Sequence, residues 1–126
     1  MAAPNLGATS LTITGRTTAV SLSTTSATVV VANSSASGMV LKVNTLVVAN
    51  DDGVNSADIT LVYNTSSGGG GTSFAIANTI AVPADASLDV LNKPLYLEEN
   101  KSILATASTG SDLDVIISYE EISETP

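Results

Sequence analysis

The feature of this 126-residue sequence that most restricts its fold is a two-residue alternation of apolar and polar side chains. In ADITLVYN (57–64), Ala57, Ile59, Leu61 and Tyr63 would share one face of a strand. LDVIISYE (113–120) repeats the alternation. A period of two is typical of half-buried strands, and the abundant Val, Ile and Thr favour strand over helix. The sequence therefore predicts an all-β protein.

The same reasoning places strands along nearly the whole chain. We expect eight strands, at 10–14, 17–23, 26–33, 39–50, 56–64, 73–82, 87–97 and 102–108, with 113–122 closing as a ninth if the first is only an arm. In the segment LKVNTLVVA, strict alternation predicts one face made of Leu41, Val43, Val47 and Ala49. Turn residues separate the strands, and no helical or βαβ pattern interrupts them. This spacing predicts an antiparallel jelly-roll-like β-sandwich.

The glycine-rich stretch TSSGGGGTSF (65–74) could be an interdomain linker or the tip of a hairpin. It lies between two predicted strands, and neither flank is long enough to form a credible domain. We therefore expect a mobile, exposed hairpin tip of about eight residues within a single domain. A phosphate-binding loop would need a lysine and a following helix, and neither is present. The expected organisation is an extended N-terminal arm (1–14) and a sandwich domain (15–126).

Composition excludes several classes of function. The chain has no cysteine and no histidine, so disulfides, thiolate metal sites and the usual general base are absent. Its net charge is −8, with only four basic residues, which disfavours nucleic-acid binding. No stretch is apolar enough to span a membrane, and the N-terminus lacks a secretory signal, so we expect synthesis in a cytoplasm. We expect no enzymatic activity, no cofactor, and neither nucleic acid nor membrane as a partner.

The best metal candidate is the acidic segment DDGVNSAD, whose possible oxygen ligands are Asp51, Asp52, Asn55 and Asp58. Calcium prefers six to eight oxygen ligands, but the spacing does not match an EF-hand loop. Local hydrogen bonds in a tight turn explain the same residues. We therefore predict a turn and no metal, with calcium binding as the alternative.

Two other patterns could suggest catalysis. The carboxylate doublets Glu98–Glu99 and Glu120–Glu121 could indicate a glycosidase, but adjacent residues on a strand point to opposite faces. Ser102 beside Lys101 could form a serine–lysine pair, but we expect these two residues in a turn, without a recognisable signature. We predict solvated charges and no catalytic residue.

The predicted strands are apolar on their second face as well, which favours association with other subunits. The residues expected there, among serines and threonines, are Val30, Leu46, Val48, Val62 and Ile116. Isolated surface valines are also normal in β-proteins, which is the simpler reading. The N-terminal segment carries Leu6, Leu11 and Ile13, and it could be disordered or could add a strand to a neighbouring subunit. The predicted subunit interface consists of Leu6, Leu11, Ile13, Val48, Val62 and Ile116.

The order of segments resembles a group of small virion structural proteins of tailed bacteriophages, common in marine cyanophages. The resemblance covers residues 8–123, and its most specific part is VPADASL followed by LYLEENKSILATAS. These motifs describe scaffold geometry and imply no catalytic residue.

The resemblance implies a capsid decoration or cement subunit on the outer surface of the phage head. Its expected partners are the major capsid protein or other virion proteins, and its expected assembly is a homo-oligomer, with a trimer favoured. The alternatives are an accessory protein of a neck or tail ring, and a module that binds glycan on the host surface.

Overall fold

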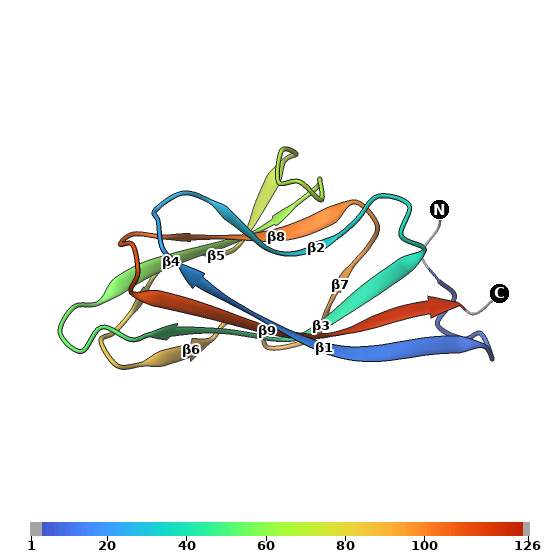
Figure 1. Cartoon of the computed structure of the whole chain (residues 1–126), viewed down its shortest axis with the longest axis horizontal. Helices are drawn as coiled ribbons and strands as arrows, with labels where there is room; N and C mark the ends of the chain where they lie inside the picture. The colour runs from blue at the N-terminus through green and yellow to red at the C-terminus, as the bar shows by residue number, and fades with distance from the viewer. Residues whose placement is uncertain (1–3, 125–126) are drawn as a thin grey trace.

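The chain folds into two antiparallel β-sheets that pack face to face, as Figure 1 shows. The structure is a computed structural model that describes residues 4–124, and no helix occurs within that range. Sheet A contains β1 (Leu11–Leu22), β9 (Leu113–Glu124), β3 (Met39–Asn50), β6 (Ser87–Asp89) and β7 (Leu95–Leu97). Sheet B contains β2 (Thr28–Asn33), β8 (Lys101–Ala107), β4 (Ala57–Asn64) and β5 (Ser73–Val82). The predicted all-β antiparallel sandwich is confirmed.

The strands pair in a nested order. β1 pairs with β9, β2 with β8, β3 with both β6 and β7, and β4 with β5. Strands near the start of the chain pair with strands near its end, and strands in the middle pair with each other. The chain therefore resembles one long hairpin rolled into two sheets. This order is consistent with the predicted jelly-roll-like arrangement.

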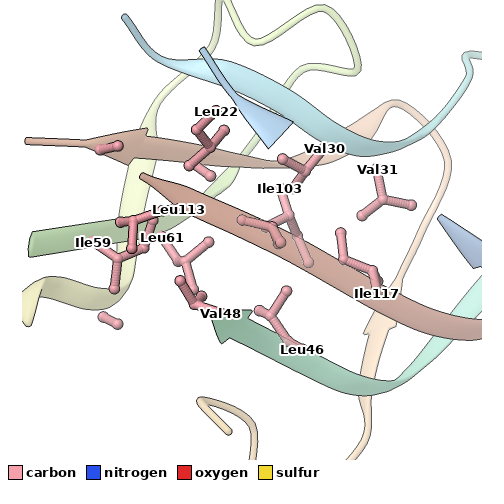
Figure 2. Close-up of a cluster of buried hydrophobic side chains, with 14 of the residues drawn as sticks. Leu22, Val30, Val31, Leu46, Val48, Ile59, Leu61, Ile103, Leu113 and Ile117 are labelled. Atoms are coloured by element: carbon pink, nitrogen blue, oxygen red, sulfur yellow. The ribbon is translucent and has the colours of Figure 1, made fainter. Parts of the chain in front are cut away.

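The core lies between the sheets and is aliphatic. Figure 2 shows Ile59, Leu61 and Ile103 of sheet B pointing toward Val48, Leu46 and Ile117 of sheet A. The alternation predicted for 57–64 and 113–120 is correct, because Ala57, Ile59, Leu61, Leu113, Val115 and Ile117 are all buried. Burying such a side chain contributes about 1.5–3 kcal/mol, so these strands supply much of the stability.

A β-bulge in β3 overturns part of the predicted pattern. The register with β9 shifts between Val43 and Thr45, which moves the inward positions from odd to even residue numbers. Leu46 and Val48 are therefore fully buried, whereas Val47 and Ala49 face outward and are half-buried. A similar shift in β2, between Val29 and Val31, accompanies the burial of Val30. The prediction that Val30, Leu46 and Val48 lie on an outward face is wrong for this reason.

Two strand boundaries also differ from expectation. Residues 10–14 and 17–23 do not form separate segments, because β1 runs through Gly15 and pairs continuously with β9. The predicted strand 87–97 is interrupted, and only β6 and β7 at its ends pair with β3. Pro94 lies in the interruption and cannot donate a backbone hydrogen bond. The interruption also lies opposite the β3 bulge, where a regular ladder cannot continue.

Three buried asparagines close the loops that follow their strands. Asn33, Asn50 and Asn64 are the last residues of β2, β3 and β4. The side-chain amide of Asn33 donates to the carbonyl oxygens of Met39 and Leu97, at 2.9 and 3.0 Å. The Asn50 amide donates to those of Asn55 and Val82, at 3.0 and 2.9 Å. These bonds satisfy buried backbone carbonyls and fix the start of each loop.

Candidate interaction surface

The outward face of sheet A carries an exposed apolar row across three neighbouring strands. Because Val115 and Ile117 of β9 point into the core, the intervening Ile116 points outward. Ile116 pairs with Ala19 of β1 and with Val47 of β3. We call Ala19, Ile116 and Val47 the outer row. Ile116 remains 42% exposed, so the row presents an uncovered apolar surface.

A second apolar row lies further along the same face. Ile122 of β9 pairs with Ile13 of β1 and with Val40 of β3. Ile122 and Val40 are buried, although neither belongs to the central core cluster, while Ile13 is 57% exposed. Polar residues, including the paired Glu120 and Lys42, lie between the two rows. The face is therefore apolar in two bands with charged residues between them.

The six predicted interface residues divide among several places. Three of them lie on the outward face of sheet A: Leu11, Ile13 and Ile116. Leu11 and Ile13 are an even number of residues from Ala19, the β1 partner of Ile116, so their side chains point to the same side. Val62 lies on the outward face of sheet B and is half-buried. Val48 is 0% exposed in the core, so its predicted surface contact is wrong because of the β3 bulge.

The predicted arm (1–14) is partly a strand. Residues 11–14 belong to β1 and pair with residues 121–124 of β9 in the same chain. Ahead of them, the backbone N–H of Asn5 donates to the Glu124 carboxylate, and Leu6 is 46% exposed. Residues 1–3 lie outside the described residues. The expected pairing of the arm with another subunit stays a prediction.

The glycine-rich segment is a hairpin connection, as predicted, but it folds back onto sheet B. Added to Gly69, a Cβ would lie 3.1 Å from Leu104 Cδ2 and 3.4 Å from Val29 Cγ2, so the loop packs on these outward side chains. Its backbone is held by Asn64, while Ser67 bonds to Asn100 and the Ser102 hydroxyl donates to the Ser66 carbonyl. Residues 68 and 70–73 are exposed, as predicted, and Figure 1 shows the connection between β4 and β5 standing out from the sandwich. The predicted mobility of this tip stays a prediction.

Two of the four glycines are required by this loop geometry. Gly69 has φ of +85°, which side-chain-bearing residues rarely adopt. A Cβ at Gly71 would lie 2.4 Å from Thr65 Oγ1 and 2.9 Å from the Ser66 nitrogen. The glycine run therefore encodes a compact loop, which answers the linker question in favour of one domain.

The acidic segment 51–58 forms a hydrogen-bonded turn. Asp52 Oδ1 accepts the backbone N–H of Val54 at 2.8 Å and that of Asn55 at 3.2 Å. The Val54 bond, followed by the Asn55 bond, lowers the pKa of Asp52 below its usual range. Within residues 4–124, no group of three acidic side chains is placed to hold a metal ion.

The residues considered for catalysis serve structural contacts. Ser102 is buried in β8 rather than in the expected turn, and its hydroxyl is 2.6 Å from the Ser66 carbonyl oxygen. Glu121 accepts a hydrogen bond from Arg16 Nε at 2.7 Å, and this bond raises the pKa of the Arg16 guanidinium. The pKa of Tyr63 is raised mainly by burial and, to a smaller extent, by the negative charge of Glu98.

No cavity or cleft is found in the described part of the chain. Nor do residues 4–124 contain a helix that could cross a membrane.

Sequence reasoning missed Ala19 and Val47 as neighbours of Ile116. Neither is unusual in its own segment, and the strand register that aligns them joins residues about 70 to 100 positions apart. No family model matches this chain, and the comparison with curated proteins finds no similar sequence.

Proposed function

We propose that this chain is a non-enzymatic structural subunit of a bacteriophage particle, and specifically a decoration or cement protein on the outside of the head. The resemblance of residues 8–123 to small virion proteins supports the setting. The outer row on sheet A carries the proposal, because an exposed apolar band across three rigid strands is suited to bind a flat protein surface.

The mechanism is burial of apolar surface between neighbouring proteins. Completing the burial of a 42% exposed isoleucine contributes about 0.6–1.3 kcal/mol, as a fraction of the full transfer value. Each contact is modest, but many copies acting on one shell would resist the pressure of packaged DNA. Acidic residues elsewhere on the surface, within a net charge of −8, keep the unbound subunit soluble.

The test is binding of variants to particles that lack the protein. Ile116→Glu should weaken binding at least about ten-fold, because a charge would have to lose its water in an apolar contact. Ile80→Glu is the matched control, since Ile80 is 39% exposed and lies on β5 of the other sheet. Equal binding of the two variants and the unaltered chain would overturn the proposal.

The contribution of the N-terminal segment is tested separately. Deletion of residues 1–10 removes Leu6 but leaves every residue of the β1–β9 pairing in place. The proposal expects a folded protein with weaker particle binding. Unchanged saturation of particles would remove this segment from the binding surface.

A further inference from the structure

The two sheets have four outer edges, and natural proteins block such edges against unwanted pairing. On sheet A the edges are β1 on one side and β6 with β7 on the other. On sheet B they are β2 and β5. The four edges differ sharply in how they are protected.

Three of the edges are interrupted or very short. β6 and β7 have three residues each and are separated by a segment containing Pro94. β2 has six residues and a register shift at Val30. The pairing of β5 is irregular at two places, and Thr79 within it has φ of +51°, which bends the strand. None of these edges offers a long, regular template.

β1 is the exception. It has 12 residues, and all 12 pair with β9 without a register shift. It contains no proline, and its only charged residue, Arg16, is bound to Glu121 of its own sheet. Among residues 4–124, no strand pairs with its far side. The acidic residues of sheet A lie on β9 and beyond, so the edge itself carries no negative charge although the chain is strongly acidic.

We propose that β1 pairs with β1 of a second copy of this chain, antiparallel, so that the two sheets A become one continuous sheet across a two-fold axis. A single open edge can pair with the same edge of a second copy, which gives a closed dimer. A ring of three would need two different edges on each subunit that fit each other. The edge strand that lacks protection is therefore most economically explained as the seam of a dimer. This inference goes beyond the proposed function and does not depend on it.

The same symmetry restricts the pairing register, and the longest overlap is obtained when the axis lies near the middle of β1. A two-fold axis perpendicular to the sheet keeps outward residues outward in both copies, so it must pass through a residue pair of equal number. Centring on Arg16 would oppose two guanidinium groups. Centring on Thr17 places Thr17 opposite Thr17 and Arg16 opposite Thr18, and it uses residues 12–22 of each strand. Threonine pairs across antiparallel strands are favourable.

The first experiment measures mass in solution by light scattering or sedimentation over a dilution series. The proposal expects a species of twice the 12.6 kDa of one chain, formed reversibly as concentration rises. A chain that stays monomeric up to about 1 mM, or one that forms trimers, would overturn it.

The second experiment locates the seam. The chain has no cysteine, so Thr17→Cys introduces the only thiol. Opposite residues in antiparallel strands have Cα atoms about 4.5–5.5 Å apart, a separation that a disulfide can span. We expect Thr17→Cys to form a covalent dimer at least about ten-fold faster than Ala75→Cys, which places the thiol on the edge strand β5. Equal rates would contradict the proposal.

A third variant tests the pairing without covalent chemistry. Thr17→Glu puts two like charges opposite each other at the seam, whereas Ala75→Glu adds the same charge elsewhere. Both positions are exposed, so both variants should keep the far-ultraviolet spectrum of the unaltered chain. Only Thr17→Glu should be monomeric. Dimerisation of Thr17→Glu with unaltered affinity would refute β1 as the seam.

Discussion

Replacing Asn64 by alanine should destabilise the protein strongly, although the residue lies beside an exposed glycine-rich loop. Asn64 is 0% exposed. Its Oδ1 accepts the backbone N–H groups of Ser66 and Gly71, at 2.9 and 3.0 Å. Its Nδ2 donates to the carbonyls of Gly69 and Gly71, both at 3.2 Å, and to the Ser73 hydroxyl at 2.9 Å. One side chain thus anchors both ends of the β4–β5 connection.

The magnitude follows from these bonds. The carboxamide has two N–H groups, so about four hydrogen bonds act at once, and each contributes about 0.5–1.5 kcal/mol net. Water can replace part of the loss at exposed Gly71. We therefore expect the free energy of unfolding to fall by about 2–4 kcal/mol, a large share of the stability of a small domain. Urea denaturation should show a midpoint lower by about 1–2 M.

Two comparisons make the result decisive. Asn92→Ala, at an exposed loop position, should change the free energy of unfolding by less than about 0.5 kcal/mol. Asn64→Asp keeps the acceptor oxygens but points an ionised carboxylate at backbone carbonyls, which raises the pKa of the new carboxyl in the folded state. Its destabilisation should therefore be largest at neutral pH and should shrink as pH falls. An Asn64→Ala loss below about 0.5 kcal/mol would refute the reasoning.

Three further predictions test other parts of the fold. Gly69→Ala should lower the free energy of unfolding by about 1–2 kcal/mol, because φ is positive and the added methyl group would lie 3.1 Å from Leu104. Gly68→Ala has open space around it and should leave the free energy of unfolding nearly unchanged in the same urea titration. Val48→Ala should cost about 2 kcal/mol and Val47→Ala less than about 1 kcal/mol; equal losses would contradict the bulge-shifted register. Asp52 stabilises the fold while it is ionised, so this contribution is present above its unfolded pKa and is lost as pH falls through its lower folded value. Asp52→Asn should therefore flatten the acid limb of stability measured against pH, and an unchanged limb would contradict the pKa assignment.

Local patterning was sufficient for most of the fold. The predicted bounds of 39–50 and 73–82 agree with β3 and β5, because turn residues mark both ends of each. The inward faces of β4 and β9 follow strict alternation, which requires no knowledge of partners. Strand existence and inward faces are short-range properties, so a single sequence contains them.

The bulge in β3 shows where local patterning fails. Leu46, Val47, Val48 and Ala49 are all apolar. The sequence is therefore compatible with burial of either the odd-numbered or the even-numbered residues of this segment. The choice depends on how β3 aligns with β9 and β7, which is a long-range property. Assignment of Val48 to the surface failed because the alternation was continued through the bulge without a break.

The asparagine anchors were missed but are readable. Asn33, Asn50 and Asn64 each end an apolar strand and precede Ser, Asp or Thr. An asparagine in that position commonly bonds to the backbone of the turn that follows. The signal is local, and it could have predicted the hydrogen bonds that Asn64 makes to the glycine-rich loop.

The candidate surface was predicted only in part. Ile13 and Ile116 were identified as exposed apolar residues, but their common face depends on the β1–β9 register. Their neighbours Ala19 and Val47 have no distinguishing sequence signal. A site composed of ordinary aliphatic residues is defined by its arrangement, and the arrangement is tertiary.

The central claim is that the protein acts by association on a phage particle, and quantitative mass spectrometry of purified particles tests it most directly. The account predicts hundreds of copies of this chain per particle, in fixed ratio to the major shell protein. About six or twelve copies would instead place the chain in a neck or tail ring. Absence of the chain from purified particles would contradict the account.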